Sequence, residues 1–76
     1  MTDHQKPSVG RIVHYVGKGG ACTAATVTEV DEEQGALVGL FVTAPSAIHL
    51  LPLSEGGATA DQAERQPGTW HWPERV

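Results

Sequence analysis

The sequence has little cysteine and no long apolar run, and each shortage excludes a class of protein. Cys22 is the only cysteine, so no disulfide can form within the chain, and small secreted scaffolds normally depend on several. No stretch approaches the ~20 consecutive apolar residues of a membrane-spanning helix. The opening segment "MTDHQKPSVG" does not resemble a signal peptide. We therefore expect no secretion through a signal peptide and no membrane partner, which leaves the cytoplasm or a particle as the location.

Basic side chains are also scarce. The chain has five Lys and Arg against nine Asp and Glu, for a formal net charge of −4. Binding to a phosphate backbone requires several basic side chains on one surface, so nucleic acid is not an expected partner. The acidic run in "DEEQG", residues 31–35, favours a solvated turn over a metal site.

The length sets the scale of the fold. A chain of 76 residues forms one domain at most, and its stability is marginal unless a metal or an oligomer contributes. Residues 1–8 are polar and are expected to form a flexible N-terminal arm. Residues 9–76 are expected to form the single small domain.

What the sequence does contain is a series of short segments with strand composition, separated by turn residues. The segment 47–55 carries Pro52, which favours an edge position. The segment 56–68 is a Gly-rich loop in which "TADQAER" could form one helical turn. The predicted strands occupy residues 9–16, 21–30, 36–44, 47–55 and 69–73.

These elements predict an all-β fold, a small five-stranded antiparallel barrel. An SH3-like barrel is the first choice, because its last strand closes against its first and would place residues 69–73 beside 10–16. An OB-like barrel is the alternative. Alternation places Trp70 and Trp72 on one face of the last strand and His71 on the opposite face.

The aromatic residues are few, and two of them stand together in "TWHW". Tryptophan is enriched at interface hot spots, but a domain this small also needs large side chains for its core. Both roles remain open for Trp70 and Trp72. The candidate protein-interface residues are Trp70, Trp72, Tyr15, Phe41 and Leu40.

No pattern of catalytic residues is present, and we expect that the protein is not an enzyme. The candidate metal ligands are His14, Cys22 and His71, but none of them stands at a recognised ligand spacing, so no metal or other cofactor is expected from the spacing alone. His14 and His71 would become neighbours if the first and last strands pair.

Three segments, "VGRIVHYVG", "CTAATVTEV" and "PGTWHWPER", resemble a recurrent set of very small proteins from actinobacteria and the phages that infect them. The similarity covers most of the chain, and members of the set are mostly of unassigned function. It implies no catalytic residue. The association with phages favours a virion accessory protein, such as a capsid decoration protein, with the major capsid protein as a candidate partner and a homo-oligomer or an assembly as the working form. The alternative is a small adaptor or regulatory module that binds a host protein, a peptide or nucleic acid through an SH3- or OB-like groove.

Overall fold

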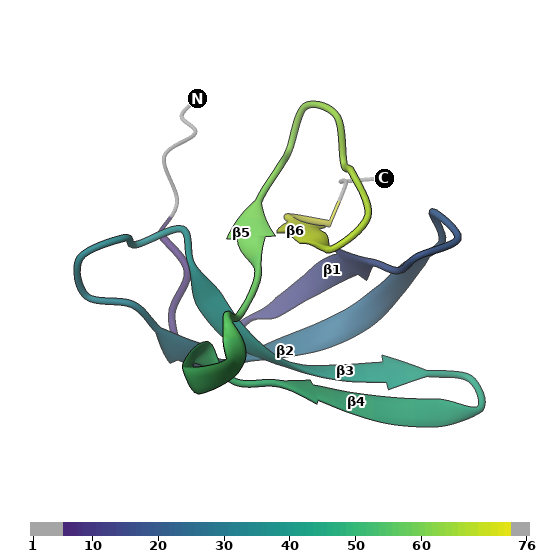
Figure 1. Ribbon diagram of the computed structural model, residues 1–76, viewed down its shortest axis with the longest axis horizontal. Coiled ribbons are helices and arrows are strands. Elements are labelled where there is room, and N and C mark those ends of the chain that lie inside the picture. Colours follow the sequence, from purple (N-terminus) through teal and green to yellow (C-terminus); the bar gives the residue numbers. More distant parts are fainter. Residues whose placement is uncertain (1–5, 74–76) are drawn as a thin grey trace.

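The computed structural model describes residues 6–73, which form six strands and one short 3₁₀ helix (Figure 1). The predicted arm, residues 1–8, lies outside the described residues except for positions 6–8, which form no strand. No helix in residues 6–73 is long and apolar enough to cross a membrane. The elements are β1 (Ile12–Val16), β2 (Cys22–Val30), β3 (Val38–Ala44), β4 (Ala47–Leu51), η1 (Leu53–Glu55), β5 (Thr59–Ala60) and β6 (Thr69–His71).

All six strands belong to one sheet, in the order β4-β3-β2-β1-β6-β5. The prediction of an all-β fold is confirmed, as is the pairing of the last strand with the first, since β6 runs antiparallel to β1. The outer position expected for the strand before Pro52 is also confirmed, because β4 lies at the end of the strand order. The prediction of five antiparallel strands was wrong: the structure has six, and β5 runs parallel to β6.

The missed strand β5 lies in the segment predicted to be a loop with one helical turn. Its two residues form a strand because β6 offers a free edge, and a segment this short carries no periodic signal of its own. The segment after it forms the single helical turn that was predicted, and Arg65 ends this turn with a positive φ of 56°. Its amide donates to the Asp61 carbonyl at 3.1 Å, which closes a single turn.

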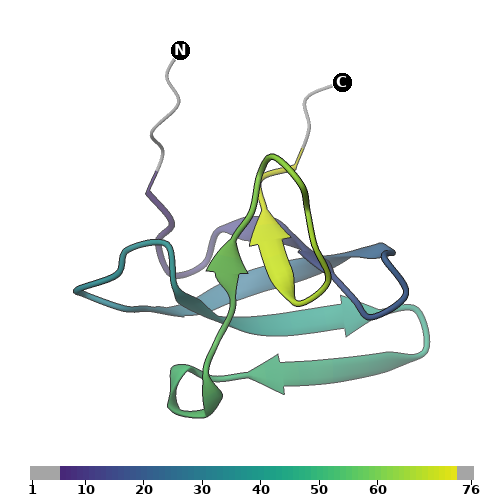
Figure 2. The same cartoon turned by 45° about the horizontal axis from the view of Figure 1, so that its top comes forward.

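The sheet curls into a half-barrel, and Figures 1 and 2 show β5 and β6 standing over the broad surface of the other strands. An isolated antiparallel bridge between Val38 and Ala58 connects the start of β3 with the approach to β5. Gly57 makes this bridge possible. Its φ is +57°, and a Cβ at this position would lie 2.5 Å from the Val38 carbonyl oxygen.

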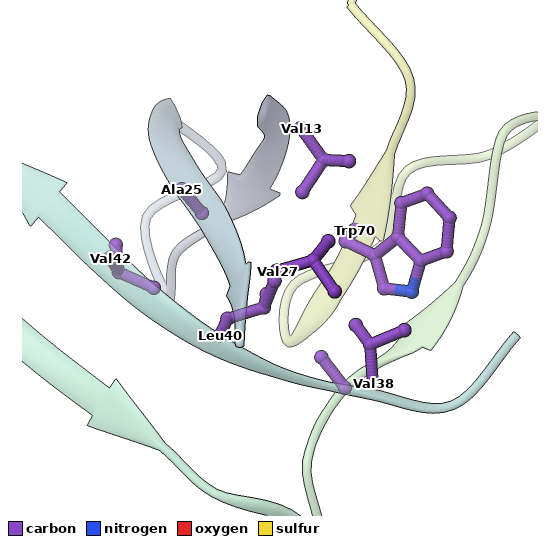
Figure 3. Packing of buried hydrophobic residues seen from close by; sticks show 8 residues of the cluster. Val13, Ala25, Val27, Val38, Leu40, Val42 and Trp70 are labelled. Carbon is purple, nitrogen blue, oxygen red and sulfur yellow. The ribbon is translucent and has the colours of Figure 1, made fainter. Parts of the chain in front are cut away.

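The core is thin and lies on the concave face of the sheet. Figure 3 shows valines from β1, β2 and β3 directed toward the indole ring of Trp70. Most of these side chains are valine or alanine. Valine favours strands, but such small side chains fill little core volume. The buried cluster consists of Val13, Ala25, Val27, Val38, Leu40, Val42, Ala58 and Trp70.

Candidate functional site

The five predicted interface residues are not gathered on one surface. Trp70 and Leu40 are core residues, only 2% and 1% exposed. Tyr15 and Trp72 are partly buried and pack against that core. Phe41 follows Leu40 in β3 and therefore lies on the opposite face of the sheet. The described fold thus leaves Phe41 as the one member of the set on the convex side.

The two tryptophans have different roles: Trp70 belongs to the core, whereas Trp72 packs against it. Trp70 fills the core, and its indole N–H donates to the Ala36 carbonyl at 2.9 Å. The Trp72 ring meets the Trp70 ring edge to face, with centroids 5.3 Å apart, and the Arg11 guanidinium lies 4.9 Å from the Trp72 ring centroid. Trp72 therefore covers one side of the core and is covered in turn by a cation.

The convex side of the sheet carries a surface that the sequence prediction did not define. Residues directly opposite each other in neighbouring strands share a face, so the register identifies the rows of side chains across β1 to β4. We call this surface the outer face; it consists of Ile12, Thr26, Phe41 and Leu50 in one row and Ala24, Thr43 and Ile48 in the next.

The outer face is uncharged, Phe41 in it is half-buried, and three of its aliphatic side chains are exposed. Ile12 is 54% exposed, Ile48 is 63% exposed and Leu50 is 69% exposed. No residue of either row has a formal charge. Two of these three side chains stand on β4, the outer strand of the sheet.

A cluster of three potential metal ligands lies at the end of the second row. His14 stands directly opposite both Ala24 in β2 and His71 in β6. Cys22 lies two residues before Ala24 in the same strand, so its side chain is on the same face as the two histidines. The strand register therefore brings together three residues that are far apart in sequence.

The geometry of this cluster is compact. One donor atom from each of His14, Cys22 and His71 lies within 4.8 Å of the other two. Cys22 Sγ is 3.7 Å from His71 Nε2, and the two imidazole rings meet edge to face with centroids 5.4 Å apart. His71 is 1% exposed, His14 is half-buried and Cys22 is exposed, so the cluster reaches from the interior to the surface.

The carboxylate of Asp61, in the loop before β6, interacts electrostatically with His71 of this cluster. Amides of Glu64 and Gln66 donate to the carboxylate of Asp61 at 3.0 and 3.3 Å. These hydrogen bonds favour the ionised form and lower the pKa of Asp61, and an electrostatic interaction with His71 makes a smaller contribution in the same direction. The loop that precedes β6 thus carries an ionised carboxylate on the side of His71.

The concave side opens into a groove that is lined by residues of β1 to β4 and of the turn between β1 and β2. It has a volume of about 430 Å³. Lys18 stands at the turn between β1 and β2 that borders it. The lining consists of Tyr15, Gly17, Lys18, Ala21, Thr23, Val42, Ala44, His49 and Leu51.

Sequence reasoning identified the members of the cluster but not their convergence. The informative signal was the expected pairing of the first and last strands, which placed His14 near His71; the addition of Cys22 required the register of β1 with β2. Comparison of the chain with protein-family models, with curated proteins and with solved structures gives no match.

Proposed function

We propose that this protein is a non-catalytic structural module that assembles through its outer face and serves as a virion accessory protein. The observation that supports the proposal is an uncharged apolar surface across four strands, with three large side chains more than half exposed. Contiguous apolar surface of this kind marks interaction sites, because water contact with it is unfavourable.

The edge strand strengthens the argument. Sheets normally protect an exposed edge with Lys or Pro within the strand, since an edge with free backbone groups invites pairing. The residues of β4, "AIHLL", include no Lys, Pro or acidic residue. Ile48 and Leu50 of this strand are exposed in the single chain, and a partner seated on the outer face would cover them.

The occupant that we propose for the outer face is a second copy of this chain. Two outer faces are complementary to each other in chemistry, because neither row carries a formal charge that a second copy would repel. The thin core also gives the chain a reason to associate, since burial against a partner stabilises the folded form of a small domain.

The contact is small, and this sets the expected affinity. Four strands spaced about 4.8 Å apart, with two rows of side chains about 7 Å apart, present roughly 250–300 Å². A stable interface typically buries about 800 Å² per partner. We therefore expect a weak, concentration-dependent dimer, which many copies on a particle would reinforce.

The finer assignments belong to the same proposal. The curled sheet with its last strand beside its first is compatible with an SH3-like barrel. The resemblance to small actinobacterial and phage proteins supports a virion location, where copies at high local density would make weak contacts effective. A role in stabilising a capsid fits a module that offers an uncharged apolar surface for assembly.

Sedimentation velocity of the purified chain over roughly 10–500 µM tests the association. We expect the fraction of dimer to rise with concentration, and Ile48→Lys or Leu50→Lys to abolish it, because each places a charge in the contact. Val9→Lys is the matched control, since Val9 is 67% exposed but lies outside the strands, and this variant should associate like the wild type.

A chain that remains monomeric throughout this range would refute the second copy as occupant. Mass spectrometry of purified particles then tests the virion role separately, with high copy number expected. A monomer found at high copy on particles would assign the outer face to a capsid protein. A monomer that is missing from particles, with a peptide partner mapped to the groove by chemical-shift changes at Tyr15 and Leu51, would favour the adaptor alternative.

A further inference from the structure

We propose that His14, Cys22 and His71 form a binding site for one Zn²⁺ ion per chain. The proposal goes beyond assembly through the outer face and does not depend on it. It rests on donor chemistry, separation and burial of these three side chains.

The donor set suits zinc. Zn²⁺ is bound in proteins chiefly by cysteine thiolate and histidine nitrogen, and a cluster of two imidazoles and one thiolate contains only these donors. The hard oxygen donors that select Ca²⁺ or Mg²⁺ do not contribute to the cluster. The ligand chemistry therefore points to a late transition metal, with Zn²⁺ as the most available member.

The separations also suit a tetrahedral ion. With Zn–S near 2.3 Å and Zn–N near 2.05 Å, tetrahedral angles place a sulfur and a nitrogen ligand about 3.6 Å apart. Cys22 Sγ and His71 Nε2 are 3.7 Å apart. All the donor atoms lie within 4.8 Å of one another, and a side-chain rotation that moves the donor atom of the exposed Cys22 or the half-buried His14 by about 1–1.5 Å would bring them to tetrahedral spacing.

The backbone holds the three ligands in place. Each ligand comes from a different strand, and neighbouring pairs of those strands are fixed by the registers His14 with His71 and Val16 with Cys22. Buried His71 provides a rigid base, while exposed Cys22 provides the entry path. Three protein ligands leave one tetrahedral position, which would take water.

An ion at this position would join β1, β2 and β6, the strands that close the half-barrel. A domain of this size is stabilised by such a cross-link between strands, because its core alone supplies little stability.

The same geometry without an ion would be a plain hydrogen bond between the Cys22 sulfur and the His71 ring. The two interpretations differ in stoichiometric metal binding, in the metal-dependence of the melting temperature and in the spectrum of a substituted ion.

The test titrates the purified full chain with Zn²⁺ against a chromophoric chelator, and with Co²⁺ as a spectroscopic probe. We expect one ion per chain with a Kd of about 1 µM or tighter. Co²⁺ should give the visible bands of a tetrahedral site and a near-ultraviolet thiolate-to-cobalt band. Zn²⁺ at a 100-fold excess over Kd should raise the melting temperature by roughly 10 °C or more.

Two substitutions and one control variant test which side chains bind the ion. Cys22→Ser and His14→Ala change residues that are not fully buried, so the variants should fold, as circular dichroism would verify. Each should weaken Zn²⁺ binding at least about tenfold, and Cys22→Ser should remove the thiolate-to-cobalt band. His49→Ala removes an exposed histidine of β4 and should bind like the wild type.

Failure of the wild type to bind Zn²⁺ at about 100 µM would overturn the proposal, as would Cys22→Ser binding that equals the wild type. Equal loss of binding in His49→Ala would also overturn it, because the binding would then not belong to this cluster. None of these outcomes changes the expected behaviour of Leu50→Lys, so the zinc site and the dimer fail or stand separately.

Discussion

Replacing Trp70 by Phe is the most direct test of the proposed architecture of the core. Trp70 is 2% exposed, and its indole N–H donates to the Ala36 carbonyl at 2.9 Å. Phe retains an aromatic ring at the centre of the cluster but removes the N–H donor and part of the buried surface. The substitution therefore measures the hydrogen bond and the surplus packing without emptying the core.

The expected cost follows from two contributions. The smaller ring gives up about 40 Å² of buried apolar surface, worth ~1 kcal/mol at 25 cal/mol per Å². The lost hydrogen bond contributes roughly 0.5–1.5 kcal/mol, near the lower end if water replaces it at Ala36, which is an exposed residue. We expect a loss of about 2 kcal/mol in the free energy of unfolding, or a decrease of roughly 8–16 °C in melting temperature.

Urea unfolding followed by circular dichroism measures this loss, and Trp72→Phe is the matched control. Trp72 is only half-buried, so its replacement should cost less than about 1 kcal/mol. Acrylamide quenching gives a second measurement, because Trp70 alone in Trp72→Phe should resist quenching while Trp72 alone in Trp70→Phe should not. A larger cost for Trp72→Phe, or easy quenching of Trp70, would refute the assignment of Trp70 to the core.

Three further substitutions or treatments test other parts of the structure. Gly57→Ala should destabilise the fold by about 2 kcal/mol or more in thermal unfolding, because its φ is +57° and the new Cβ would crowd the Val38 carbonyl; a neutral effect would contradict the described bridge. Amide hydrogen bonds from Glu64 and Gln66 lower the pKa of Asp61 in the folded chain, so its contribution to stability is complete well above the ordinary pKa of an aspartate and is lost as the pH falls through the folded pKa. Asp61→Asn should therefore flatten the acid limb of the stability profile, and an unchanged limb would count against the loop geometry. Alkylation of exposed Cys22 by iodoacetamide should be fast in chelator and slow with bound Zn²⁺, and equal rates would speak against ligation.

The sequence predicted most of the strands because their residues carry clear local signals. Val, Ile and Thr mark β1, β2 and β3, and the Gly and acidic turns separate them. Pro52 correctly indicated an outer strand. The short strand β5 carries no such signal, since its two residues become a strand only through the edge that β6 provides.

The site was harder to predict, for a physical reason. Metal-ligand motifs are recognised when the ligands stand close together in the chain, and Cys22 and His71 are 49 residues apart. Their approach depends on register, because a shift of one residue in either pairing would turn one of them to the opposite face. The outer face was missed for the same reason: Ile48 and Leu50 form a surface only with residues from neighbouring strands.

The position of β6 between β1 and β5 has a consequence for how the chain folds. The hairpins from β1 to β4 connect neighbouring segments and can form quickly, whereas β6 must join β1 across a long intervening stretch. Before β6 pairs with β1, the edge of β1 is exposed and Trp70 is not yet packed in the core. Closure by β6 is therefore expected to limit the folding rate, and an intermediate that awaits β6 would be the species most prone to aggregate.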